Sequence, residues 1–348
     1  MAHFIDAVSI AFQVDERSSS SRAGVLRQFR EAEERLDGTG LDLLVTCEGM
    51  SSLGQSVAEA ETLEEPGEFL LLYREFAFRN RCTVAGSVKL REGEAVFNAL
   101  VFFAPDGSCA GIYRKTYPTE RELLSGILPG SGAETAVTPA GVLGGVICFD
   151  INFDPLRDGY AALRPDLLCF SSMCNGGHLL ANWAYKCRSF LVSSVKDGLS
   201  VIVDPLGRTV NTTTYYNRIT WARLNLDRFV MHCDCNIDRF PEIRRRYGKE
   251  VLIDVEQNLC TAVLYSLGER SAAEIAREFE LIEIDDYLAG WRRSSPAWQN
   301  RGNRFSRLPA DVETRARAGA AARTSGWTRS ATSRKEDEAS PPPFHMKL

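Results

Sequence analysis

The feature that most constrains the fold of this chain is an alternation of short apolar segments with longer amphipathic ones. Residues 41–46 are almost all apolar, a pattern typical of a strand that is buried on both faces. Residues 24–36 instead place apolar side chains at helical spacing, from Val25 to Leu36, with charged side chains between them. Alternation of this kind predicts an α/β fold in which helices cover the faces of the sheets.

The same pattern extends through the first two-thirds of the chain. Strands are expected over residues 7–12, 41–46, 83–89, 97–104, 109–113, 142–149, 167–171, 192–195, 200–203 and 209–212. Helices are expected over residues 24–36, 68–80, 155–163 and 178–190. A Pro-Asp-Gly turn at residues 105–107 is typical of a hairpin between two of these strands.

The bulk composition is that of an ordinary globular protein. Hydrophobic residues make up 44% and charged residues 25% of the 348 positions, and the net charge of −5 gives no reason to expect nucleic-acid binding. The first residues lack the basic and apolar regions of a secretory signal, and no run of about 18 apolar residues suggests a membrane span. We therefore expect a cytoplasmic protein whose ten cysteines are free thiols.

Composition divides the chain into three parts. Residues 1–228 carry the α/β pattern, and residues 229–293 are expected to form an extension that packs on this core or on a second subunit. Within the extension, Ser271 followed by Glu274 is the signature of a capping box at the start of a helix. Residues 294–348 are rich in Ser, Arg, Ala and Gly and poor in apolar residues, which predicts a disordered basic tail.

Three expected strand ends carry a reactive or charged side chain. Glu48 follows a buried strand, where desolvation raises the pKa of a carboxyl toward the range of a general base. Lys115 follows a hairpin strand, and a fixed ammonium at such a point stabilises an oxyanion. Cys148 ends a third strand, with the Phe149 backbone N–H beside it as a second oxyanion donor. Taken singly, each has an ordinary alternative: a solvated strand end for the charged residues and a core position for the cysteine.

In this order and spacing, the three stretches resemble the nitrilase superfamily of carbon–nitrogen hydrolases. The Glu element of that family resembles the stretch that ends in Glu48, the Lys element resembles residues 113–116, and the Cys element resembles residues 145–150. The resemblance spans roughly residues 5–228. It implies a four-layer αββα sandwich that forms a homodimer or a higher homo-oligomer.

The resemblance also implies the roles of the site residues. Glu48, Lys115 and Cys148 would be the catalytic triad, joined by a second glutamate a few residues after the lysine. Glu122 fits that spacing better than Glu120 does. Residues expected to line the substrate or oxyanion site are Phe149, Asn152, Met173, Asn175 and His178.

Departures from the family pattern lie where the substrate pocket is expected. The nucleophile is followed by Phe149-Asp150, as in amidase-like and carbamoylase-like branches, whereas true nitrilases tend to have Trp-Glu there. Tyr117 stands where a histidine is common, and residues 171–177 lack a tryptophan that is often found in this loop. The resemblance therefore favours a small amide or carbamoyl compound over a nitrile as the substrate.

The implied activity is hydrolysis of a non-peptide carbon–nitrogen bond through a thioester on Cys148, with no cofactor and no metal. The sequence leaves open nitrile hydrolysis, amide-forming N-acyl transfer, and a catalytically silent member that binds a ligand. A Cys–His dyad would need His178 or His232 as its base. His232 also lies beside Cys233 and Cys235, but no second ligand pair at zinc-site spacing follows.

Overall fold

The computed structural model describes residues 2–12, 22–49, 57–196 and 198–300. The chain divides into two compact units, Met1–Tyr287 and Leu288–Leu348. All the sheets lie in the first unit, and the predicted basic tail lies outside the described residues from position 301 onward. In the described part of the chain, no helix is both long enough and apolar enough to cross a membrane.

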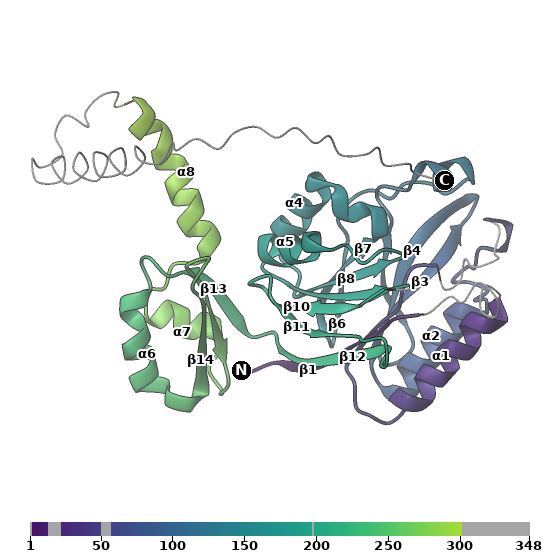
Figure 1. Ribbon diagram of the computed structural model, residues 1–348, viewed down its shortest axis with the longest axis horizontal. Coiled ribbons are helices and arrows are strands. Elements are labelled where there is room, and N and C mark those ends of the chain that lie inside the picture. The colour runs from purple at the N-terminus through teal and green to yellow at the C-terminus, as the bar shows by residue number, and fades with distance from the viewer. Residues whose placement is uncertain (1, 13–21, 50–56, 197, 301–348) are drawn as a thin grey trace, which may run out of the picture. The chain divides into compact units, whose positions relative to one another are not determined.

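The first unit is built on two six-stranded sheets (Figure 1). The first sheet has the order β12-β1-β2-β3-β4-β5, and β1, β2 and β3 run parallel. Its strands are β1 (Phe4–Ile10), β2 (Leu43–Val45), β3 (Thr83–Glu92), β4 (Ala95–Phe103), β5 (Cys109–Arg114) and β12 (Ile219–Asn225).

The second sheet has the order β11-β10-β9-β8-β7-β6, and β7, β8 and β9 run parallel. Its strands are β6 (Thr135–Thr138), β7 (Gly141–Ile147), β8 (Leu167–Ser172), β9 (Phe190–Val195), β10 (Val201–Val203) and β11 (Thr209–Thr212). The expected strand over 142–149 is too long by two residues. It ends at Ile147 because Cys148 adopts a left-handed conformation, with φ of 48°, and opens a 3-10 helix, η2 (Cys148–Asn152).

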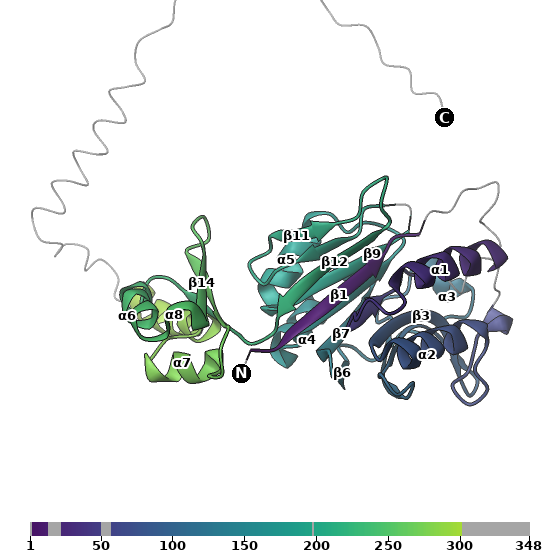
Figure 2. The same ribbon diagram turned by 90° about the horizontal axis from the view of Figure 1, so that it is seen from below.

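Helices cover the outer faces of both sheets (Figure 2). α1 (Arg22–Leu36) and α2 (Glu68–Asn80) pack on the first sheet, where Phe29 and Phe76 join the core formed with β1, β2 and β3. α4 (Asp154–Leu163) and α5 (His178–Cys187) lie on the second sheet, where the Tyr160 hydroxyl bonds to the Gly145 carbonyl of β7 at 2.6 Å. The predicted four-layer αββα sandwich is confirmed.

The inner faces of the two sheets are joined by buried serine hydroxyls. Ser9 of β1 donates to the carbonyl of Ser193 in β9, and Ser194 donates back to the carbonyl of Ile10. Ser171 of β8 donates to the Thr46 carbonyl at 2.8 Å, just after β2 ends. These small polar side chains let the sheets approach closely while satisfying backbone groups at the strand ends.

A third, three-stranded antiparallel sheet follows the sandwich. Its strands are β13 (Arg228–His232), β14 (Val251–Glu256) and β15 (Thr261–Ser266), in the order β13-β15-β14. Two helices supply side chains to its core, α6 (Phe240–Tyr247) and α7 (Ala272–Glu278). The predicted capping box at Ser271 and Glu274 opens α7 and is confirmed, since the Ser271 hydroxyl accepts the Glu274 N–H.

The remaining elements are short, apart from the last helix. They are α3 (Glu120–Leu124), α8 (Ile284–Asn300) and the 3-10 helices η1 (Val57–Glu59), η3 (Ile237–Arg239) and η4 (Gly248–Glu250). The expected helix over 178–190 ends at Cys187, because Arg188 turns left-handed with φ of 57° and directs the chain into β9.

Candidate active site

Three strand ends supply the predicted catalytic residues. Glu48 lies three residues after β2, Lys115 directly follows β5, and Cys148 directly follows β7. β5 points the same way as β2, because two antiparallel pairings separate it from β3. The first sheet therefore brings Glu48 and Lys115 to one edge.

Lys115 is the centre of a buried ion cluster at this edge. Its Nζ donates to Oε1 of Glu48 at 2.9 Å and to Oε2 of Glu122 at 2.9 Å, and its side chain is only 1% exposed. Burial lowers the pKa of Lys115, but the charges of Glu48 and Glu122 outweigh burial and hold the pKa above its ordinary value. The ammonium is therefore charged at neutral pH.

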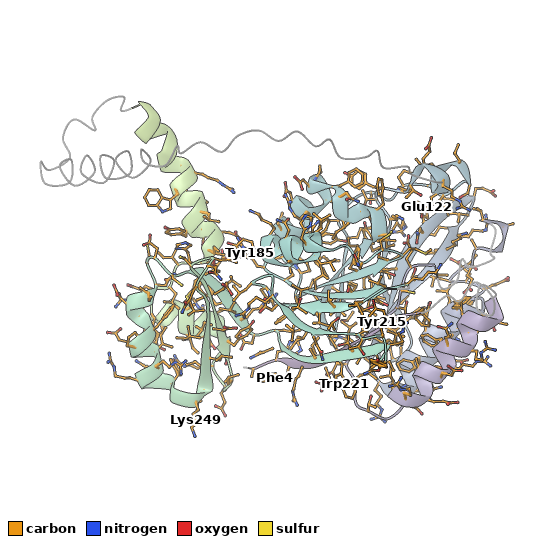
Figure 3. All side chains as sticks on the ribbon, viewed as in Figure 1. Phe4, Glu122, Tyr185, Tyr215, Trp221 and Lys249 are labelled. Atoms are coloured by element: carbon orange, nitrogen blue, oxygen red, sulfur yellow. The ribbon has the colours of Figure 1, made fainter. Side chains whose placement is uncertain are left out.

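Glu122 occupies the position that the sequence favoured for the second glutamate. It comes from α3 (Figure 3), and its carboxylate also accepts the Thr119 N–H at 2.8 Å in a capping box that opens this helix. Burial raises its pKa, but the ammonium of Lys115 and hydrogen bonds from Lys115, Asn98 and Thr119 bring the pKa below its ordinary value. Glu120 has no contact with Lys115 among the described residues.

Asn98 belongs to the same cluster, although sequence analysis did not select it. Its Nδ2 donates to Oε1 of Glu48 at 2.9 Å and to Oε1 of Glu122 at 2.7 Å. Its backbone carbonyl accepts the Lys115 N–H at 2.8 Å. The signal was available in the predicted hairpin, because its ladder pairs Ala99 with Arg114 and so places Asn98 opposite Lys115.

Cys148 is partly buried, and its thiol is a weak acid in this environment. Burial and the nearby negative charge of Glu48 raise the pKa of the thiol to about 11. Hydrogen bonds from the Ser172 hydroxyl and the Met173 N–H, and the charge of Lys115, oppose that rise. These contacts place the thiol beside both Glu48 and Lys115, so the structure brings the three predicted residues together.

Met173 connects the thiol to the Glu48 carboxylate. Its backbone N–H donates to Oε2 of Glu48 at 3.2 Å and also faces the Cys148 sulfur. The Ser172 hydroxyl accepts the Cys174 N–H at 2.9 Å, which orients it toward the thiol. Ser172 is a second residue that sequence analysis did not single out, because its strand end reads as an ordinary buried strand.

Asp150 holds the turn that carries the nucleophile. Its carboxylate accepts the Tyr113 hydroxyl at 2.7 Å, the Tyr117 N–H at 2.8 Å and the Ile147 N–H at 3.0 Å. Burial raises the pKa of this carboxyl to about 6, although the three hydrogen bonds oppose the rise. Asp150 therefore fixes the backbone on both sides of Cys148.

An aromatic cluster is formed by residues that follow Cys148 and Lys115 in the chain. Phe149 is 41% exposed and meets the Phe153 ring edge to face at 5.2 Å, and Phe153 stacks on Tyr117 with the ring centroids 3.8 Å apart. Tyr117 is the residue that replaces the common histidine. The residue directly after Cys148 therefore belongs to an aromatic cluster.

The other predicted pocket residues are exposed and differ in their contacts. The Asn152 side chain donates to the Phe149 carbonyl at 3.0 Å, so it supports the turn. Met173 is 41% exposed. The side chains of Asn175 and His178 are exposed and form no hydrogen bond with other described residues. The groups around the Cys148 thiol do not include an imidazole among the described residues.

A metal ion needs several ligand side chains that converge on one point. Among the described residues, no group of three or more His, Cys, Asp and Glu side chains is positioned to hold a metal ion. The His232 region is instead part of β13, and the His232 ring stacks on Tyr287 with the centroids 4.5 Å apart.

The chain is similar in sequence to known hydrolases. The sequence model of the carbon–nitrogen hydrolase family matches residues 19–229. A nitrilase and fragile histidine triad fusion protein, NitFhit, of Drosophila melanogaster is 28% identical over 56% of this chain and 48% of its own length. The human omega-amidase NIT2 is 24% identical over 47% of this chain and 64% of its own length. The chain thus spans about half the length of the first curated relatives it matches.

Solved structures share the fold. Nit3 of Saccharomyces cerevisiae, a member of branch 10 of the nitrilase superfamily, has a TM-score of 0.55 at 19% identity and covers 71% of this chain and 95% of its own. An amidase from Nesterenkonia has a TM-score of 0.55 at 18% identity, with 71% and 97% covered. With more than half of its residues matched by the family model, this chain belongs to the carbon–nitrogen hydrolase family of the nitrilase superfamily.

Proposed function

We propose that this protein hydrolyses a linear amide or N-carbamoyl compound through a thioester on Cys148. The observation that carries the proposal is the buried ammonium of Lys115, which bonds to Glu48 and Glu122 beside a partly buried thiol. A base, a fixed cation and a nucleophile in contact are the groups that acyl transfer to sulfur needs.

In the first half of the cycle, Glu48 takes the thiol proton as the Cys148 sulfur attacks the substrate carbonyl. A base is required because the pKa of the thiol, about 11, leaves it protonated at neutral pH. Lys115 and the Phe149 N–H stabilise the oxyanion that forms. Glu48 then donates its proton to the nitrogen as the carbon–nitrogen bond breaks, and the amine leaves.

In the second half, water attacks the thioester carbonyl and gives a proton to Glu48. The carbon–sulfur bond breaks, and the carboxylic or carbamic acid leaves as the thiol regains its proton. Glu122 keeps Lys115 in place throughout, since it accepts a second hydrogen bond from the same ammonium. This cycle needs the residues of this chain and water only.

The relatives support an amide over a nitrile as the substrate. Omega-amidase NIT2 and deaminated glutathione amidase are among the similar human proteins, although an aliphatic nitrilase of Sinorhizobium fredii is also similar. The aromatic cluster of Phe149, Phe153 and Tyr117 favours an uncharged, apolar acyl group, because such a group buries against aromatic rings without losing solvation.

The test is detection of the covalent intermediate by intact-mass spectrometry. The protein is mixed with a panel of amides, N-carbamoyl compounds and nitriles, and quenched in acid. We expect an acyl adduct with amides, strongest with apolar acyl groups, that disappears in Cys148→Ala and persists in the control Cys109→Ala, whose thiol is exposed at the start of β5. An adduct that survives in Cys148→Ala, or turnover by that variant, contradicts the proposal.

The same experiment separates hydrolysis from acyl transfer. Adding a primary amine diverts the thioester to a new amide only if the amine competes with water at the second step. The expected homo-oligomer and cytoplasmic location stay predictions, and light scattering after size-exclusion chromatography tests the first.

A further inference from the structure

The two oxygens of the Glu48 carboxylate have different surroundings. Oε1 accepts hydrogen bonds from two side chains, Lys115 Nζ and Asn98 Nδ2, both at 2.9 Å. Among the described residues, Oε2 accepts one hydrogen bond, from the Met173 N–H at 3.2 Å, and that N–H also faces the Cys148 sulfur. A carboxylate oxygen has two lone pairs in its plane, so within the described part of the chain two donors occupy Oε1 and one donor occupies Oε2.

Asn98 uses both hydrogens of its amide nitrogen on carboxylates. One goes to Oε1 of Glu48 and the other to Oε1 of Glu122, at 2.9 and 2.7 Å. The assignment of nitrogen to this end of the amide follows from chemistry, because both neighbours are acceptors and the amide oxygen would repel them. Asn98 therefore bridges the same two carboxylates that Lys115 bridges.

This bridge matters because the cluster holds two carboxylates and one ammonium. Two like charges that share one cation tend to retain a proton between them, as paired carboxylates do in other buried sites. The Asn98 amide lowers the pKa of Glu122, alongside Lys115 and Thr119. A neutral donor to both carboxylates thus favours the doubly ionised pair without adding a second positive charge that would weaken Glu48 as a base.

We infer that Asn98 is a positioning residue that keeps Glu48 and Glu122 ionised and reserves Oε2 of Glu48 for the thiol proton. The inference rests on the proposed function, since it concerns the base of that reaction. Asn98 itself acts through the two carboxylates, and its backbone carbonyl helps to hold Lys115 as well. The proton moves between Cys148 Sγ and Glu48 Oε2, and no other bond changes in this step.

The first experiment follows the alkylation of Cys148 by iodoacetamide as a function of pH in Asn98→Ala, with the modified peptide quantified by mass spectrometry. This readout needs no substrate. Because the thiol is protonated below its pKa of about 11, alkylation in this range needs the carboxylate cluster to accept the thiol proton, and the acid limb of the profile reports protonation of that cluster. Loss of a hydrogen bond to a charged group moves that limb up by about one pH unit. The control Asn258→Ala changes an exposed turn residue and leaves the limb in place.

The second experiment measures turnover. In Asn98→Ala, kcat should fall by about 10- to 100-fold with KM within about twofold, because the base is misplaced while the substrate pocket is intact. Asn98→Asp places a third carboxylate beside Glu48 and Glu122, and it should shift the acid limb of the alkylation profile to a still higher pH. Asn98→Ser, which cannot reach both carboxylates, serves if the alanine variant is poorly folded.

An acid limb that stays at the wild-type position in a folded Asn98 variant overturns the inference, whatever happens to stability. Failure of the proposed function looks different. In that case the wild-type protein forms no adduct with any amide, whereas the alkylation profile still shows whether Asn98 controls the ionisation of the cluster.

Discussion

At the residue scale, Cys148 occupies a backbone conformation that residues with a side chain disfavour. Cys148 has φ of 48°, directly after β7, and it is the point where the strand turns into η2. The left-handed region costs a residue with a Cβ atom about 1–2 kcal/mol. The strained residue is the one that carries the thiol beside Glu48 and Lys115, so the strain is part of the candidate site.

We expect this strain to reverse the usual order of two substitutions. Cys148→Gly should be more stable than Cys148→Ala by up to about 1 kcal/mol, because glycine adopts positive φ without penalty whereas alanine keeps the strain. Both variants should be inactive. Urea denaturation followed by circular dichroism measures the difference, and an alanine variant as stable as the glycine variant would show that the turn is relaxed.

Asp150 gives a second prediction, which concerns pH. Its pKa of about 6 in the folded protein lies above the ordinary value of 3.8, so the folded state holds this proton more tightly than the unfolded state does. The stability that this group contributes is therefore full below pH 3.8 and is lost as pH rises to about 6. The loss amounts to about 3 kcal/mol for a shift of two pH units.

Asp150→Asn removes this titration. We expect its free energy of unfolding to be lower than that of the wild type at pH 4, since an amide cannot accept all the donors that face it. The gap should narrow by about 2 kcal/mol between pH 4 and 7, because part of the loss has already occurred at pH 4. A gap that is constant across this range, measured by urea titrations at each pH, contradicts the prediction.

Most residues of the candidate site were selected from the sequence, and two were not. Glu48, Lys115, Cys148 and Glu122 each have a reactive or charged group at a recognisable position in the chain. Asn98 and Ser172 lie within strands, where an amide or a hydroxyl reads as an ordinary strand residue. The register of the predicted hairpin could have pointed to Asn98, which lies opposite Lys115, whereas the neighbours of Ser172 come from separate strands that a linear pattern does not display.

At the element scale, α2 begins without a side-chain cap of its own. Its N-cap is Gly67, which has no side chain to accept a hydrogen bond. The carboxylate of Glu61 caps the helix instead, because it accepts the N–H groups of Phe69 at 3.1 Å and Leu70 at 2.8 Å. Glu61 also pairs through its backbone with Leu90 of β3, so it connects the helix to the sheet. A Cβ atom on Gly67 would lie 2.6 Å from the Glu61 side chain, which explains the glycine there.

We expect Glu61→Gln to destabilise the protein by about 1–2 kcal/mol, because one amide oxygen replaces two charged acceptors at the positive end of a helix. Thermal unfolding and urea denaturation measure the change. The control Glu64→Ala alters an exposed carboxylate of the same loop and should stay within about 0.5 kcal/mol of the wild type. Equal effects in the two variants would contradict a capping role.

The sequence predicts an element well when the residues that signal it are close together in the chain. The capping box of α7 was predicted because Ser271 and Glu274 are three residues apart. The Glu61 cap lies eight residues from Phe69 and follows no local rule. The strands β6 and β12 were not predicted either, since β6 is short and β12 pairs with β1 from the other end of the fold.

At the scale of the whole molecule, the residues of the candidate site are divided between the two sheets. Glu48 and Lys115 follow strands of the first sheet, and Cys148 and Met173 follow strands of the second. The αββα sandwich was predicted through its resemblance to a family, because alternating strands and helices alone are compatible with several α/β architectures. The third sheet was not predicted, since its region resembled nothing recognised in the sequence.

The hydrogen bond from Ser171 to the Thr46 carbonyl is the contact between sheets that lies nearest to Glu48 in sequence. In Ser171→Ala, this buried carbonyl loses its partner, which costs about 1–3 kcal/mol of stability. We also expect kcat to fall while KM changes little, because the contact ties the segment that leads to Glu48 to β8, whose Ser171 pairs with Ile147 directly before Cys148. Steady-state kinetics and urea denaturation test both effects, with the exposed Ser131→Ala as the control. Unchanged kcat in a destabilised variant would limit Ser171 to a structural role.

The serine contacts between the sheets also bear on how such an enzyme changes under selection. In the proposed reaction, a proton crosses the gap between Glu48 and Cys148, which follow strands of two different sheets. Ser9, Ser171 and Ser194 join the two sheets and help to set their spacing. A substitution that alters the volume between the two sheets can therefore change the turnover rate although the substituted residue does not contact the substrate. Laboratory evolution for faster turnover should collect changes among these inward-facing residues as well as at the pocket rim.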